Sequence, residues 1–369
     1  MSPTMLTYIN EESDVLANII LRHRQSLEEV SRFASQKTLR RILILATGSS
    51  LNAAFCARYF FERCGISIDI KEPYTFSHYE NSDPQADMVI AISQSGKSAS
   101  TLEAMRKVQA QGRPVFALTA DPQSPFGKAS DYPLDILTGI ESVGFVTRGF
   151  SATVLNLLLI ALLIARQQQR LTESQVEEYV AQLQRIAATL PLVIVRTEAF
   201  IHQHQSVLRN GTRFVAIGYG ALVGVAKELE TKFTETVRVP SSGFELEAYM
   251  HGPYLEANAE HVMFFFEDRP DARSRALREY MTPAVAKTFT LTLAKAAQDD
   301  QTLALDVAVD HHFSPLLLIV PVQLMAFHIA SLKGIDLSVR IFDDFDRVLK
   351  SKIWTIRRKI CWVLIRTST

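Results

Sequence analysis

Hydroxyl-bearing side chains gather directly after two short apolar runs in the first half of the chain. The segment Thr47-Gly48-Ser49-Ser50 follows the run 41–46 (RILILA), and Ser93-Gln94-Ser95-Gly96-Lys97-Ser98 follows the run 88–92 (MVIAI). Hydroxyl groups and loop amides at a strand end present partial positive charge, which suits a phosphate dianion. One such turn is commonly only a helix cap. Two at matching strand ends predict a phosphate site formed by Gly48, Ser49, Ser50, Ser93, Gln94, Ser95 and Ser98.

Two further patterns bear on this site. Ser100-x-x-Glu103 has the form of a capping box that starts the next helix, which leaves 93–98 as an exposed loop. The nucleotide-binding pattern GxxxxGKS/T does not occur in the sequence, so nucleotide hydrolysis is not indicated.

A predicted helix in the second half carries three charged residues on one face. Glu228, Lys232 and Glu235 lie at i, i+4 and i+7, while its apolar residues fall on another face. Such a stripe is usually a solvated face with helpful ion pairs. This helix, however, starts at the edge of its sheet where ligands bind, which favours a role at a site.

His251 precedes Gly252-Pro253, which predicts a rigid turn that presents an imidazole. A carboxylate and a histidine are the groups that aldose–ketose chemistry needs. A proton must pass between O1 and O5 to open the sugar ring, and a base must then carry a proton between C1 and C2. Spacing alone does not pair Glu235 with His251.

The elements that would position these residues form two similar α/β halves. Continuous apolar runs at 41–46, 88–92, 114–119 and 132–137 alternate with helical segments, and runs at 213–217, 262–266, 288–293 and 305–309 repeat the order. Gly48 matches Gly218, and Phe116 matches Phe289 at nearly the same offset, so an internal duplication is the economical explanation. This pattern predicts the α/β class, with parallel sheets covered by helices on both faces.

The domain organisation follows from these halves. We expect an N-terminal segment of one or two surface helices at 1–36, a first domain at 37–170, linker helices at 171–200, a second domain at 201–353 and a tail at 354–369. The longest apolar run, 152–165, is shorter than the ~20 residues that a membrane span needs, so we interpret it as a buried helix.

The amino-acid composition indicates which binding partners to expect. Lys plus Arg and Asp plus Glu number 39 each, so no net charge attracts nucleic acid or a membrane surface, and a small molecule is the expected partner. The three cysteines show neither zinc-site nor redox spacing, so we expect no metal and no cofactor. Free cysteines and the lack of a signal peptide pattern favour the cytoplasm.

The motifs TGSSLNAAF, SQSGKSAST and KELETKFTE…HGP together resemble the double sugar-isomerase (SIS) domain family over about residues 10–353. The resemblance implies two flavodoxin-like subdomains and a sugar 6-phosphate substrate. Within the family the chain is similar to the isomerase half of glucosamine-6-phosphate synthase and to fructoselysine- and glucoselysine-6-phosphate deglycases. By this resemblance Ser49, Ser50, Ser93, Ser95 and Ser98 bind phosphate, and 141–150 (ESVGFVTRGF) closes over the sugar, with Arg148 in place of a lysine.

The same resemblance assigns roles in catalysis. Glu235 takes the place of the family's catalytic glutamate, and His251 that of its ring-opening histidine, with the same sixteen-residue separation. In the family that histidine serves the neighbouring subunit, which implies a homodimer or higher homo-oligomer. Lys350, in Leu349-Lys350-Ser351, resembles a lysine that can form an imine with the open sugar, and Glu228 and Lys232 are expected to contact substrate.

The chain also departs from the family pattern. Ala248 stands where the family often has a glutamate before His-Gly-Pro, the acidic insertion 343–346 displaces Lys350, and 354–369 has no counterpart. The synthase's glutaminase domain and its nucleophilic cysteine are not seen, which argues against glutamine as nitrogen donor.

Three functions stay open, and we favour the first: a deglycase that releases an amine from a hexose 6-phosphate, a related isomerase or deaminase, and a non-catalytic sugar-phosphate sensor. The amine, and the choice between 1-amino ketose and 2-amino aldose, stay open as well.

Overall fold

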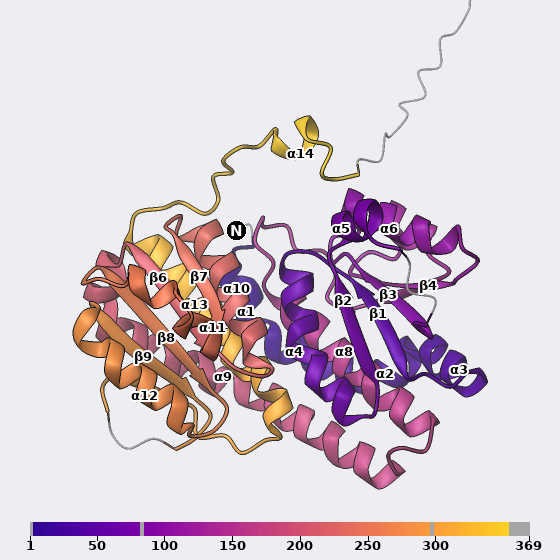
Figure 1. Ribbon diagram of the computed structural model, residues 1–369, viewed down its shortest axis with the longest axis horizontal. Helices are drawn as coiled ribbons and strands as arrows, with labels where there is room; N and C mark the ends of the chain where they lie inside the picture. The colour runs from indigo at the N-terminus through magenta and orange to yellow at the C-terminus, as the bar shows by residue number, and fades with distance from the viewer. Residues whose placement is uncertain (1–2, 82–84, 296–298, 354–369) are drawn as a thin grey trace, which may run out of the picture.

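Two parallel five-stranded sheets lie side by side in the protein (Figure 1). The computed structural model describes residues 3–81, 85–295 and 299–353. The first sheet has the order β2-β1-β3-β4-β5 and the second the order β10-β9-β8-β6-β7, which is the same order counted from the opposite edge. The strands are β1 Arg41–Leu45, β2 Ser67–Lys71, β3 Met88–Ile92, β4 Val115–Thr119, β5 Tyr132–Asp135, β6 Arg213–Gly218, β7 Ser241–Glu245, β8 His261–Glu267, β9 Lys287–Thr292 and β10 Thr302–Ala304. The predicted α/β class with parallel sheets is confirmed.

Three strands differ from the sequence prediction. The edge strands β2 and β7 were not predicted, because SIDIK mixes charges with apolar residues and SSGFE is mostly polar. The predicted strand at 305–309 is wrong, since the edge strand of the second sheet is β10. Leu305 and Val307 are apolar because they pack against the core. Their amides donate to the carbonyl oxygens of Thr292, the last residue of β9, and of Leu293 directly after it.

Helices cover both sheets and fill the space between them. They are α1 Met5–Asn10, α2 Glu12–Ser26, α3 Glu28–Gln36, α4 Ser49–Arg63, α5 Pro73–Tyr79, α6 Ala99–Gln109, α7 Pro125–Ala129, α8 Arg148–Gln167, α9 Glu173–Asn210, α10 Leu222–Thr236, α11 Leu246–Met250, α12 Ala272–Met281, α13 Ser314–Leu332 and α14 Phe345–Val348. The N-terminal segment is three helices, and it is not merely a surface layer, because α2 packs against α8 and α9 through buried Leu16, Ile19 and Ile20.

Among the described residues, two helices are long and apolar enough to cross a membrane by length and composition. They are α8 and the segment His311–Leu332, and 94% and 78% of their apolar windows are buried inside the protein. Burial of this extent is typical of the core helices of a globular protein.

The two halves meet closely where α4 packs against α10. A Cβ atom placed on Gly224 of α10 would lie 2.5 Å from the carbonyl oxygen of Asn52 and closer still to Cys56 Sγ, both on α4. Only glycine permits this approach. As a consequence, the start of α4, which carries Ser49, lies against the charged face of α10.

The internal repeat also differs in one detail from the sequence comparison. Gly48 precedes α4 with a φ of 57°, and Gly220 precedes α10 with a φ of 54°. Gly218 instead ends β6. The structural equivalent of Gly48 is therefore Gly220, because both glycines make the left-handed turn from strand to helix.

Candidate functional site

A cavity of about 1040 Å³ opens at the carboxyl ends of the strands of the first sheet. Ligands of parallel α/β sheets bind at this edge, because loop amides and helix N-termini point there. We call it the main cavity. Its wall includes Thr47, Ser49, Ser50, Ser93, Gln94, Ser95, Lys97, Ser98, Glu141, Glu235, Arg238, Arg340, Asp346 and Lys352. The structure thus brings both predicted hydroxyl loops and Glu235 to one cavity, while Gly48 shapes the first loop without lining it.

The second hydroxyl loop, residues 93–98, is held by its own side chains. Ser93 Oγ accepts a hydrogen bond from the amide of Ser98 at 3.2 Å. Ser98 is the N-cap of α6, since its Oγ accepts from the amide of Thr101, and Thr101 Oγ1 donates to it at 2.8 Å. The predicted capping box at Ser100 is therefore wrong by two residues, because Ser98 already occupies the capping position.

The C-terminal segment, residues 337–353, contributes part of the cavity wall. In Figure 1 it crosses, with α14, from the second half to the first. Backbone bonds fasten it to the second hydroxyl loop: the amide of Ala99 donates to Ser351 O at 3.1 Å, and that of Ile353 donates to Lys97 O at 2.8 Å. Lys352 pairs with Ser98 in an antiparallel bridge.

The lysine that lines the cavity is not the one that the sequence suggested. Lys350 is exposed, has a φ of 53° and is not part of the described cavity wall. Lys352 is part of it, and Asp346 binds both Lys352 Nζ and Arg340 at 2.8 Å. Sequence spacing did not single out Arg340 and Lys352, because the insertion at 343–346 shifts this segment relative to the family pattern. The insertion's last carboxylate holds the two cations at the site.

A buried cation connects the three charged residues of α10. Lys232 is 1% exposed, and its Nζ lies 2.7 Å from Glu235 Oε2 and 3.5 Å from Glu228 Oε1. Burial alone would lower the pKa of Lys232, but Glu235 and Glu228 raise it above its ordinary value. Lys232 is therefore charged, and its ion pair fixes the position of Glu235, whose own side chain is 39% exposed.

Glu228 faces the other half of the protein. Its carboxylate accepts hydrogen bonds from Ser49 Oγ and from Asn52 Nδ2, both at 2.8 Å. Burial raises the pKa of Glu228, and Lys232 and Asn52 oppose that rise. Glu228 and Lys232 were predicted to contact substrate, but neither lines the described cavity. They lie behind its wall, where Glu228 holds Ser49 and Lys232 holds Glu235.

Residues 141–150, which we call the covering segment, form one wall of the main cavity. Glu141 accepts hydrogen bonds from the amides of Thr147 at 2.9 Å and of Gly149 at 2.6 Å. Burial raises the pKa of Glu141, against these bonds and Arg148. The side chain of Arg148 instead pairs with Glu11 and lies 4.5 Å above the ring of Tyr8. The segment is therefore tied to the N-terminal helices.

A smaller cavity of about 310 Å³ adjoins the main one. We call it the side cavity. Phe327 and Ser331 of α13 line it together with Met5. The two cavities share part of their walls, namely Pro3, Val143, Phe145, Leu337 and Ser338.

His251 lies apart from this cavity within the chain. It follows α11 in an exposed turn, as predicted, and is not part of the described wall. Glu247, the acid nearest to it in the sequence, binds Arg273 at 2.8 Å. The structure of one chain therefore does not bring His251 and Glu235 together.

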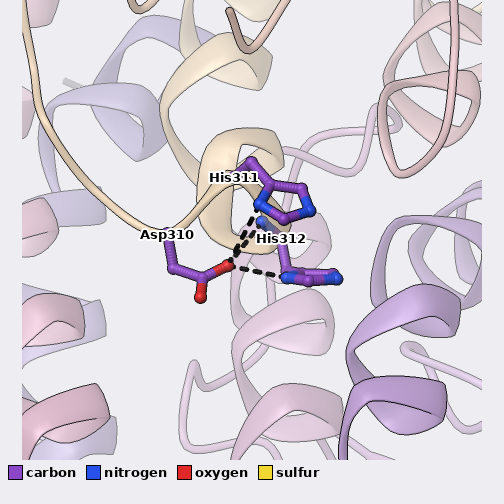
Figure 2. Close-up of side chains that lie close together, drawn as sticks. All are labelled: Asp310, His311 and His312. Atoms are coloured by element: carbon purple, nitrogen blue, oxygen red, sulfur yellow. Dashed lines mark hydrogen bonds and ion pairs between the residues drawn. The ribbon is translucent and has the colours of Figure 1, made fainter.

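Three further residues could act as metal ligands, and the sequence analysis did not single them out. Figure 2 shows Asp310, His311 and His312 gathered before α13, with their ligand atoms within 4.8 Å of one another. Asp310 Oδ1 accepts from the amide of His312 at 3.0 Å and pairs with its Nδ1 at 2.7 Å. The ring of His312 packs on Phe60. These bonds fit a helix cap at the junction of the two halves.

Comparison with known proteins agrees with the resemblance to the SIS domain family. Residues 37–166 match the family model of the SIS domain. The glutamine–fructose-6-phosphate aminotransferase (isomerizing) of Gloeobacter violaceus is 26% identical over 81% of this chain and 50% of its own length, and that of Francisella tularensis is 25% identical over 90% and 56%. The chain spans about half the length of the curated relatives that it matches.

Solved structures share the whole fold. A candidate phosphosugar isomerase of Clostridium difficile superposes with a TM-score of 0.87 at 24% identity, covering 95% of this chain and 99% of that one. The C-terminal domain of glucosamine-fructose-6-phosphate aminotransferase from Francisella tularensis gives 0.80 at 22% identity, covering 91% and 98%.

The contact between Asn52 and Glu228 is expected to matter for stability. Asn52→Ala removes a donor from a buried carboxylate, which should lower the free energy of unfolding by about 1–3 kcal/mol. Urea denaturation measures this change. The matched control is Asn10→Ala, at an exposed helix position, which should unfold like the wild type. Equal stability of the two variants would contradict the assigned interaction.

Proposed function

We propose that the chain, whose residues 37–166 match the SIS domain model, binds a sugar phosphate in the main cavity and transfers a proton between carbons 1 and 2 of that sugar. The observation that carries this proposal is a carboxylate beside two hydroxyl loops. Glu235, held by Lys232 at 2.7 Å, lines the same cavity as the two hydroxyl loops. The names of the curated relatives, which act on fructose 6-phosphate, support the same substrate class.

The residues of the chain divide the work as follows. Ser49, Ser50, Ser93, Ser95 and Ser98 bind the phosphate with their hydroxyl groups and loop amides. Arg340 and Lys352 add positive charge at the wall. Glu235 takes the proton from one carbon and returns it to the neighbouring carbon, a task for which a carboxylate needs little movement.

We propose further that the substrate carries an amine-linked group, so that the reaction is a deglycation. The support is the side cavity, whose aromatic and aliphatic wall continues that of the main cavity. A group attached to the sugar nitrogen would fit there while the phosphate occupies the hydroxyl loops. Proton transfer between C1 and C2 turns the C–N bond into an imine. Water then adds to the imine carbon, and the products are a hexose 6-phosphate and the free amine.

A second candidate is an isomerase or aminotransferase reaction that uses ammonia. The names of the curated relatives favour it, although the chain spans only half of their length. Both candidates place the same proton transfer on Glu235. We also propose that the protein works in the cytoplasm, without a metal or an organic cofactor.

The proton-transfer role is tested with Glu235→Gln. Glutamine keeps the size but cannot accept the proton, so kcat should fall by ~10²–10⁴ while substrate still binds. The wild type should also incorporate deuterium from D₂O at C1 or C2 of the product, and the variant should not. Glu279→Gln, on the exposed face of α12, is the matched control and should behave like the wild type. Near-normal turnover of a folded Glu235→Gln protein would exclude this mechanism.

The deglycase reaction is tested by incubating the protein with fructoselysine 6-phosphate and with glucoselysine 6-phosphate, followed by identification of the hexose phosphate and the amine. Ser331→Trp should fill the side cavity and raise the KM of the accepted substrate by about tenfold. Inhibition by fructose 6-phosphate, which lacks the amine-linked group, should change little. Equal loss of both affinities, or no amine release from either substrate, would argue for the second candidate.

A shared site in a homodimer is the last part of the proposal. It is supported by the exposed position of His251, outside the cavity of its own chain. An equal mixture of inactive Glu235→Gln and His251→Ala chains should regain about a quarter of the wild-type sites, because half of the dimers are hybrids with one intact site. No recovery after confirmed subunit exchange would place His251 at the site of its own chain.

A further inference from the structure

A buried carboxyl group lies behind the covering segment, in a place that the proposed chemistry does not use. Glu12, the first residue of α2, is fully buried. Its Oε2 accepts a hydrogen bond from Ser151 Oγ of α8 at 2.8 Å. The second neighbour is Gln323 of α13, which is 1% exposed. Three elements far apart in the sequence therefore meet at Glu12.

One hydrogen bond fixes the orientation of the side-chain amide of Gln323. Its Nε2 donates to the carbonyl oxygen of Thr147 at 3.1 Å, and a carbonyl oxygen can only accept. No described hydrogen bond joins Gln323 Nε2 to Glu12. Among the described residues, Gln323 Oε1 and Glu12 Oε1 are both buried without a hydrogen-bond partner.

Two acceptor oxygens in one buried cluster need a proton between them. A carboxylate at Glu12 would leave both without a donor, at a cost for each buried group. A protonated carboxyl group has a hydrogen to donate within the cluster, for which Gln323 Oε1 is the unpartnered acceptor, and it still accepts from Ser151. The neutral acid therefore satisfies each polar atom of the cluster.

The charged groups around Glu12 favour the same state. Burial is the largest influence and raises the pKa of Glu12 from its ordinary 4.5 to about 8, against the contacts with Ser151 and Gln323, which lower it, and the carboxylate of Glu141 adds to the rise. Arg148, a cation on α8 three residues before Ser151, pairs with Glu11 and not with Glu12.

The cluster reaches the main cavity through Thr147. The amide of Thr147 donates to Glu141, and its carbonyl oxygen accepts from Gln323. Both backbone groups of this one residue are thus held by side chains, and Thr147 directly precedes α8. Gln323 is thus one of the contacts that hold the covering segment, beside the bonds of Glu141, the pairing of Arg148 with Glu11 and the bond from the Ser142 amide to Tyr8.

We propose that Glu12 is a positioning residue: its protonated carboxyl group orients Gln323, which holds the covering segment over the main cavity, and loss of that proton loosens the segment and weakens ligand binding. The ligand-binding part rests on the proposed function. The positioning part does not.

The direction of the pH effect follows from linkage. The folded protein binds the Glu12 proton more tightly than the unfolded chain, so this group's contribution to stability falls as pH rises from about 4.5 to about 8 and is constant above. In the folded protein the proton itself leaves around pH 8. Loosening of the covering segment should therefore appear around that pH.

The first experiment measures hydrogen exchange of the Thr147 and Gly149 amides from pH 6 to 9.5. In the wild type, their protection factors should drop by about tenfold above pH 8 relative to Glu12→Gln. In that variant the introduced side-chain amide would donate to Gln323 at every pH, so protection should stay level. Asp14→Asn, an exposed carboxylate of the same helix turn, is the matched control and should keep the wild-type drop.

Glu12→Ala tests the same point from the other side. It removes the donor at all pH values, so protection should be low throughout and should not depend on pH. Identical pH profiles of the wild type and Glu12→Gln would overturn the proposal.

The second experiment measures the affinity for fructose 6-phosphate over the same pH range. The wild type should lose about tenfold in affinity relative to Glu12→Gln above pH 8, and this comparison cancels the titration of the ligand itself. Should no variant bind fructose 6-phosphate while the exchange profiles differ as expected, the proposed function fails and the positioning role stands. Equal affinities at all pH values, with binding intact, would overturn the link to the cavity.

Discussion

The buried ammonium group of Lys232 is the interaction on which the site depends. It lies between Glu228 and Glu235, and its charge lets two carboxylates share one face of α10. Burial of such charges is costly unless each one is paired and hydrogen-bonded. Ser49 and Asn52 supply the remaining bonds to Glu228. One cluster thereby sets the distance between Glu235 and the first hydroxyl loop.

The two halves therefore contribute different parts to one cavity. The first half supplies the hydroxyl loops at the ends of β1 and β3, and the second supplies Glu235 on α10. The close packing of α4 on α10, which Gly224 allows, brings the parts together. The C-terminal segment then crosses back and carries Lys352 to the second loop. Neither half forms this wall by itself.

The covering segment is held by polar groups that lie behind the cavity wall as well as in it. Glu141 binds two amides of the covering segment, and Gln323 binds the carbonyl of Thr147. Burial raises the pKa of both Glu141 and Glu12, and the charge of Glu141 adds to the rise at Glu12. The position of the segment thus depends on the protonation of a group, Glu12, that does not line the cavity.

Local pattern was sufficient to predict much of this protein. Continuous apolar runs determined eight expected strands, seven of which exist, because a strand buried on both faces must be apolar along its length. Serines placed directly after such strands predicted the two hydroxyl loops, since strand ends meet at one edge. Helical spacing put Glu235 on a face with Lys232. The edge strands β2 and β7 were not predicted, because a strand that pairs with one neighbour need not be apolar along its length.

Only the tertiary structure decided that Lys232 is buried, that Lys352 rather than Lys350 lines the cavity, and that Glu12 meets Gln323. Each of these depends on packing between segments that sequence spacing does not relate.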